Sequence, residues 1–159
     1  MFRGALGDDP LVRMRCADAA EKDTATQPQY LQPCKIELIE QVARSDQQEI
    51  GWHAAELMPR LKWSVEARAI VVRLLLECLQ DESKLVNTFA MQALAEQAEQ
   101  DGELCAHVPE SLQERGRAGS PAIRSIGQKL LRRLKQWASP LNRSKCPAGC
   151  TGVWVLRME

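Results

Sequence analysis

A nine-residue pattern that recurs four times at nearly constant spacing is the feature that most constrains the fold of this chain. The four segments cover residues 12–20, 50–58, 86–94 and 123–131, and their first residues lie 38, 36 and 37 positions apart. Each segment begins with Val or Ile, has a small residue four positions later and carries an apolar or small pair at positions seven and eight. Because these positions share one face of a helix, each segment is predicted to be an amphipathic helix with one buried stripe.

A second set of apolar stripes lies between the repeated segments and predicts the partner helices of the repeats. Its members recur at offsets of 37 residues: Cys34, Leu38, Ile39 and Val42, then Val71, Leu75, Leu76 and Leu79, then Val108 and Leu112. Only 4% of the chain is aromatic against 45% hydrophobic, so the core is expected to consist of Leu, Val, Ile and Ala, which favours helices over a β-sandwich. The predicted fold class is all-α, with seven helices alternating in two layers over residues 9–138.

Capping signals and breakers indicate where the helices begin and end. Four residues are predicted N-caps, two of them directly before a proline: Asp9, Ser64, Ser83 and Ser120. Asp46 and Glu49 have the spacing of a capping box, and Pro59 is predicted to kink its helix or end it early. Three glycines are predicted to lie in loops: Gly102, Gly116 and Gly119. Residues 1–8 are expected to form a lead, and residues 139–159 an irregular tail without the repeat period.

The period of 36–38 residues and the pattern Val-Arg-x-x-Ala-x-x-Ala-Leu resemble HEAT repeats, most closely at Val12-Arg13 and Ile123-Arg124. The resemblance covers about residues 9–138 and implies an α-solenoid of about 3.5 helix-turn-helix repeats. Bilin lyases, nuclear transport factors, phosphatase scaffolds and alkylpurine DNA glycosylases all use such helices. The resemblance therefore implies a fold and leaves the function open.

Two positions depart from the HEAT pattern. Gly51 and Asn87 stand where the family usually has an arginine that pairs with turn aspartates. Asp46 resembles such a turn aspartate and is predicted to lack its arginine.

The predicted array begins with the second helix of a repeat, because only eight residues precede Asp9. An end repeat needs a polar face or a cover. The residues that would face outward at this end are a poor cover: Met14, Cys16, Ala17, Ala19 and Ala20. Either the chain is part of a longer solenoid, or this end is expected to pack against another molecule, including a second copy.

The sequence offers few side chains that could act in catalysis or bind a metal ion. His53 and His107 have no second ligand at metal spacing, no glycine-rich loop follows a predicted strand, and paired carboxylates lie at the spacing of solvated helix faces. We therefore predict no catalytic residues, no resident metal and no cofactor, and we expect His53 to be a partly exposed helix residue. No apolar run approaches the roughly 18 residues that span a bilayer, and no signal region follows Met1.

The six cysteines fall into two groups. Four lie among apolar residues at helical spacing and are predicted to be reduced, buried thiols in a cytoplasmic protein: Cys16, Cys34, Cys78 and Cys105. Cys146 and Cys150 form a Cys-x-x-x-Cys in the tail, for which an adventitious disulfide and a zinc site remain alternatives.

The charge distribution is uneven although the formal net charge is zero. Residues 77–114 hold nine acidic side chains and one basic, whereas residues 115–145 hold nine basic side chains and no acidic one. The helix predicted at 121–138 combines an apolar face with a basic face. Four interpretations are open: a solvated end helix partly neutralised by the acidic block, a surface for an acidic protein, a nucleic-acid contact or a membrane-surface contact.

The repeated helices also present an outward face, on which Trp52 would be an apolar anchor between Met14 and Thr88. Equally, Trp52 could be tucked against the neighbouring repeat. We predict a non-catalytic protein-interaction module or scaffold fragment, with a nucleic-acid-binding HEAT-like protein as the alternative. The predicted contact residues run from this face into the basic helix: Met14, Trp52, Thr88, Arg124, Lys129, Arg132, Arg133 and Lys135.

Overall fold

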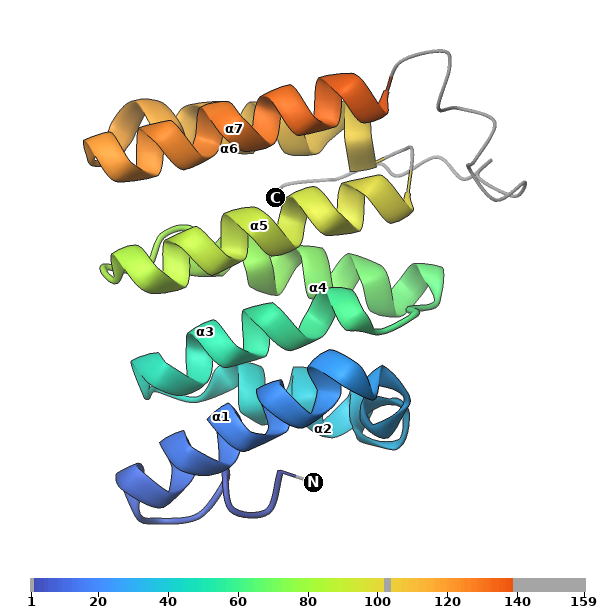
Figure 1. Ribbon diagram of the computed structural model, residues 1–159, viewed down its shortest axis with the longest axis vertical. Coiled ribbons are helices and arrows are strands. Elements are labelled where there is room, and N and C mark those ends of the chain that lie inside the picture. Colours follow the sequence, from blue (N-terminus) through green and yellow to red (C-terminus); the bar gives the residue numbers. More distant parts are fainter. Residues whose placement is uncertain (1, 102–103, 139–159) are drawn as a thin grey trace.

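The computed structural model describes residues 2–101 and 104–138, and these residues form an all-helical fold without strands (Figure 1). The all-α prediction is confirmed. The described part contains seven α-helices and three short 3-10 segments: α1 Pro10–Thr26, η1 Pro28–Cys34, α2 Lys35–Glu40, η2 Val42–Arg44, α3 Gln48–Leu57, η3 Met58–Arg60, α4 Val65–Cys78, α5 Lys84–Gln100, α6 Leu104–Ala118 and α7 Pro121–Trp137. The predictions for Gly102, the side chain of Cys105 and residues 139–159 lie outside the described residues.

The four helices that carry the repeated pattern contact one another in chain order. Helix α1 packs against α3, α3 against α5 and α5 against α7, so these helices form a column along the long axis of the molecule (Figure 1). Helix α4 packs against α5, and α6 packs against both α5 and α7, which places them beside the column. The buried apolar side chains form one continuous cluster from Phe2 to Leu134. No helix in the described residues is long and apolar enough to cross a membrane.

The small residue at the fourth position of each repeated segment allows close packing between helices. Ala54, Ala90 and Gly127 are all buried. A Cβ on Gly127 would lie 3.1 Å from Cε of Met91 on α5 and 3.3 Å from the carbonyl oxygen of Leu112 on α6. Helix α7 therefore approaches both neighbours so closely that even an alanine would force one of them to move.

The first repeated segment differs from the others because it lies at the end of the column. Ile50, Val86 and Ile123 are buried at the first position of their segments, whereas Val12 is 48% exposed. The lead that precedes α1 is more than a linker, because Phe2 and Ala5 are fully buried in the core cluster. This lead supplies part of the cover that this end was predicted to lack. Association of this end with another molecule stays a prediction.

The predicted helix starts are confirmed at four serine or aspartate N-caps. The Asp9 carboxylate accepts hydrogen bonds from the backbone amides of Leu11 and Val12 at 2.8 and 3.1 Å. The hydroxyls of Ser64, Ser83 and Ser120 likewise accept from the amide three residues later, at 3.3 to 3.5 Å. Helix α3 ends at Leu57, directly before the 3-10 turn that contains Pro59, as predicted.

Three predictions near the turns are wrong. Asp46 does not cap α3: the N-cap is Gln47, and no side chain accepts from the first turn of this helix. Asp46 also does not lack an arginine, because its carboxylate lies 3.9 Å from the guanidinium of Arg13 on the preceding repeated helix. Gly116 lies inside α6 rather than in a loop, whereas Gly119 does lie in the turn before α7.

The predicted partner helix around residues 34–42 is broken into three pieces. Helix α2 spans only Lys35–Glu40, with the 3-10 segments η1 and η2 on either side. Its stripe is nevertheless buried at Leu38, Ile39 and Val42. Pro33 lies near the end of η1, and its ring disfavours the α-helical conformation at Gln32, the residue before it.

Asn87 organises the turn between α4 and α5 and stands where the HEAT pattern has its arginine. The side chain is completely buried, and its amide donates to the carbonyl oxygens of Asp81 and Ser83 at 2.7 and 2.8 Å. The Asn87 carbonyl accepts a hydrogen bond from Nε of Arg115 on α6. The neutral Asn87 side chain therefore satisfies carbonyl groups of the α4–α5 turn and links this turn to α6.

Replacing Asn87 with alanine should destabilise the fold by about 2–4 kcal/mol, because it removes the buried side-chain hydrogen bonds to the Asp81 and Ser83 carbonyls and the acceptor for Nε of Arg115. Chemical denaturation of the full chain would measure the change. Gln92→Ala, at a partly buried position of the same helix, should cost less than about 1 kcal/mol. Equal effects of the two variants would contradict the role of Asn87.

Candidate interaction surface

The predicted apolar contact residues are less exposed than an interaction surface requires. Met14, Trp52 and Thr88 occupy equivalent positions on α1, α3 and α5, and all three are partly buried. The ring of Trp52 lies beside that of His53, with centroids 5.7 Å apart and planes tilted by 56°. Trp52 is thus intermediate between the two alternatives, an outward anchor and a tucked core residue.

The most exposed large apolar side chains lie elsewhere and were not predicted as contacts. They gather at the start of α1, around η1 and α2, and at the starts of α4 and α5: Leu11, Val12, Tyr30, Ile36, Val65 and Leu85. Ile36 does not belong to the apolar stripe that was predicted for residues 34–42. No other feature of the sequence indicated that its side chain is exposed.

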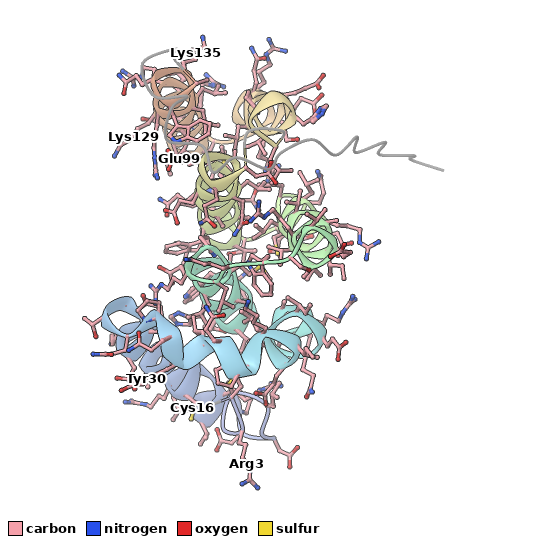
Figure 2. All side chains as sticks on the ribbon, turned by 90° about the vertical axis from the view of Figure 1, so that its right-hand side faces the viewer. Arg3, Cys16, Tyr30, Glu99, Lys129 and Lys135 are labelled. Carbon is pink, nitrogen blue, oxygen red and sulfur yellow. The ribbon has the colours of Figure 1, made fainter. Side chains whose placement is uncertain are left out.

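Helix α7 has the amphipathic character that the sequence predicted. Ser120 caps its start, and its buried face is formed by Ile123, Leu130 and Leu134. Its five basic side chains are all exposed: Arg124, Lys129, Arg132, Arg133 and Lys135. Figure 2 shows Lys129 and Lys135 at the α7 end of the column, with Glu99 on the helix below. Helix α7 carries no acidic residue.

Arg133 differs from the other basic residues of α7 because it is paired within the chain. Its guanidinium makes two hydrogen bonds with the Glu99 carboxylate on α5, at 2.5 and 2.6 Å, and lies 3.9 Å from Glu96. The bond with Glu99 raises the pKa of Arg133. Burial raises the pKa of Glu96, and Arg133 opposes that shift. Arg133 therefore holds α7 on α5 and is less available to a partner.

The other basic residues of α7 have no such partner. Within residues 2–101 and 104–138, no carboxylate pairs with Arg124, Lys129, Arg132 or Lys135. The acidic block therefore neutralises the basic helix only at Arg133. The rest of its charge faces solvent.

Two arginines that precede α7 in the chain, Arg60 and Arg68, form hydrogen bonds within the fold. Arg60, in the turn after α3, bonds to the backbone carbonyl and the carboxylate of Glu21 on α1, and donates to Oγ1 of Thr24 at 2.9 Å. Arg68 on α4 donates to the buried carboxylate of Asp101 at 2.7 Å. Arg60 links α1 to the turn after α3, and Arg68 links α4 to the end of α5, so both arginines are structural rather than free for a ligand.

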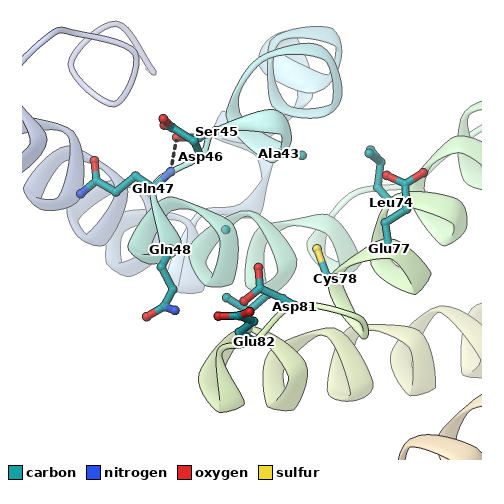
Figure 3. A pocket seen from close by; sticks show the side chains of 12 residues that line it. Ala43, Ser45, Asp46, Gln47, Gln48, Leu74, Glu77, Cys78, Asp81 and Glu82 are labelled. Atoms are coloured by element: carbon teal, nitrogen blue, oxygen red, sulfur yellow. Dashed lines mark hydrogen bonds between the residues drawn. The ribbon is translucent and has the colours of Figure 1, made fainter.

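A second surface feature, an acidic cavity, lies away from α7. It has a volume of about 420 Å³ and is formed by the turn before α3, the end of α4 and the α4–α5 turn (Figure 3). Four carboxylates and no basic side chain line it: Asp46, Glu77, Asp81 and Glu82. It was not predicted, because its residues come together only when consecutive turns stack.

Cys78 lines this cavity but is not an activated nucleophile. Burial, together with the negative charges of Asp81 and Glu77, raises the pKa of the Cys78 thiol to about 11. A thiol with this pKa is almost entirely protonated at neutral pH, and the protonated form is a poor nucleophile. Cys16, Cys34 and Cys78 are free thiols and are partly buried, where buried thiols were predicted.

His53 was predicted to be partly exposed, but the structure buries it and leaves only 7% of the residue exposed. Its Nδ1 lies 3.4 Å from the Glu56 carboxylate one turn later on α3, without forming a hydrogen bond. No group of three or more metal-ligating side chains occurs in the described part of the chain. The site with the clearest chemical character is therefore the exposed basic face of α7.

No protein family model, curated protein or solved structure matches this chain. The function is therefore argued from the residues and their arrangement.

Cys78 should react slowly with iodoacetamide. At pH 8 the folded protein should be labelled at Cys78 roughly a hundredfold more slowly than the unfolded chain, because the pKa of about 11 lowers the thiolate fraction. Asp81→Asn should recover part of the rate by removing a nearby negative charge, whereas Glu40→Gln, on α2, should not. Mass spectrometry of the labelled peptide gives the rates, and equal rates in folded and unfolded protein would contradict the raised pKa.

Proposed function

We propose that this chain is a HEAT-like α-solenoid of about 3.5 repeats that acts as a non-catalytic protein-interaction module in the cytoplasm. Its partner is an acidic protein, and the contact is the exposed face of α7. The repeat assignment rests on helices that recur every 36–38 residues and contact one another in order. It also rests on the small residues at their contacts and on Asn87, which does at its turn what an arginine does in the family pattern.

The observation that carries the functional proposal is the unpaired charge of α7. Four of its five basic side chains have no carboxylate partner among the described residues, and all of them are exposed. Like charges held on one helix repel one another, and an acidic partner relieves this repulsion. Arg133 is excluded from the contact because Glu99 and Glu96 already hold it.

Nucleic acid is the weaker alternative because the chain offers few aromatic side chains for base stacking. Trp63 is only 7% exposed, and its Nε1 donates to the Met58 carbonyl at 2.8 Å. Trp52 is partly buried. Phosphate contacts by α7 alone would give binding without sequence preference.

A charge-reversal variant tests the proposal. The triple substitution Arg124→Glu, Lys129→Glu and Arg132→Glu should weaken binding of a fluorescent polyglutamate peptide by about tenfold or more at low salt. Fluorescence anisotropy of the full chain measures this. Thermal unfolding by circular dichroism should change little, because none of the three side chains forms an ion pair in the described structure.

The matched control is the triple variant Arg44→Glu, Lys62→Glu and Arg73→Glu, which changes the net charge equally at exposed positions outside α7. It should bind the peptide with nearly the affinity of the natural sequence. If both triple variants lose binding equally, net charge rather than α7 is responsible. Tighter binding of a labelled DNA duplex than of polyglutamate would replace the proposal with the nucleic-acid alternative.

A further inference from the structure

A groove of about 210 Å³ lies between α6 and α7, at the end of the column that Figure 1 labels with these two helices. All of its lining residues belong to α6 and α7. Its floor is apolar, with Leu112 fully buried and Leu131 partly buried. Two exposed arginines line its edge, Arg117 from α6 and Arg124 from α7, and no carboxylate lines it.

Gly116 marks the groove as open space. It lies inside α6 and lines the groove, and a Cβ built on it would meet no atom within 4 Å. Glycine weakens a helix relative to alanine, and here the packing within the chain does not require it. Gly127, on the opposite wall, is different, because a Cβ there would lie 3.1 Å from Cε of Met91 and 3.6 Å from Cα of Gly116, which is itself buried. The fold therefore has room for a Cβ at Gly116 but not at Gly127.

The charge around the groove indicates its occupant. Arg124 lies near the N-terminus of α7, where it adds positive charge to the positive end of the helix dipole. In the described residues, neither Arg124 nor Arg117 pairs with a carboxylate. An apolar floor between unpaired cations suits an apolar side chain that is flanked by carboxylates.

We infer that this groove binds one apolar side chain of an acidic peptide segment in the partner protein. The inference rests on the proposed function and adds specificity to it: the face of α7 supplies charge attraction, and the groove selects a leucine-like side chain. The two arginines hold the carboxylates on either side of that residue. Such an arrangement distinguishes an acidic-apolar segment from a uniformly acidic one.

Two fluorescent peptides of Glu and Ser test the inference on the full chain, one with a single central Leu and one with Ser at that position. The Leu peptide should bind about tenfold more tightly or better, because one buried apolar side chain contributes an effect of this size. Gly116→Leu should fill the groove and remove this preference, while the Ser peptide still binds through α7.

The matched control is Gly51→Leu, which adds the same side chain at the helical glycine of the acidic cavity. It should keep the preference for the Leu peptide. Gly116→Ala should raise the melting temperature, because its Cβ would meet no atom within 4 Å and alanine favours the helix. A lower melting temperature would mean that another segment of the chain already fills the groove, and would overturn the inference.

The remaining outcomes separate the two proposals. If both peptides bind equally and the α7 triple variant still loses them, the groove inference fails and the proposed function stands. If neither peptide binds at low salt, both fail. If Gly116→Leu abolishes a concentration-dependent dimer in sedimentation velocity, a second copy is the occupant and the peptide assignment is wrong.

Discussion

Close contact between successive repeated helices is the constraint on which the rest of this structure depends. Each of these helices buries its stripe against the one before and the one after, and small residues such as Ala54, Ala90 and Gly127 permit the approach. Among the described residues, α3 and α5 each have a repeated helix on both sides, whereas α1 and α7 each have one. Val12 on α1 is accordingly exposed.

Stacking brings the turns of successive repeats together, and their polar groups must then be satisfied within the fold. Asn87 does this for the α4–α5 turn, and Arg60 does it between α1 and the turn after α3. Exposed basic side chains also occur along the column, as at Arg44, Lys62 and Arg73. Helix α7 is distinctive because four exposed basic side chains without a carboxylate partner among the described residues lie on one helix that carries no acidic residue.

The sequence predicted the regular part of this fold because periodicity and capping act locally. The helix starts at Asp9, Ser64, Ser83 and Ser120 each depend on atoms within three residues. The errors concern tertiary contacts. The Arg13–Asp46 pair joins residues from different repeats, His53 is buried by its position in the column, and Gly116 continues α6 although glycine usually favours a loop. The basic face of α7 could be predicted, whereas the pairing of Arg133 and both cavities could not, because they require knowledge of which helices meet.

A net charge of zero would indicate a neutral surface only if the acidic and basic blocks paired with each other. In the described residues they do so at Arg133 alone, since Arg115 bonds to the neutral Asn87 and Asp101 pairs with Arg68 from another segment. The remaining carboxylates of the α4–α5 turn line their own cavity, and the remaining basic side chains stay on α6 and α7. Because solution ions screen charges beyond about 8 Å, a partner that docks on α7 responds to the local excess and not to the average. The ion pairs of individual charged residues therefore indicate better than the net charge which partners such a column can bind.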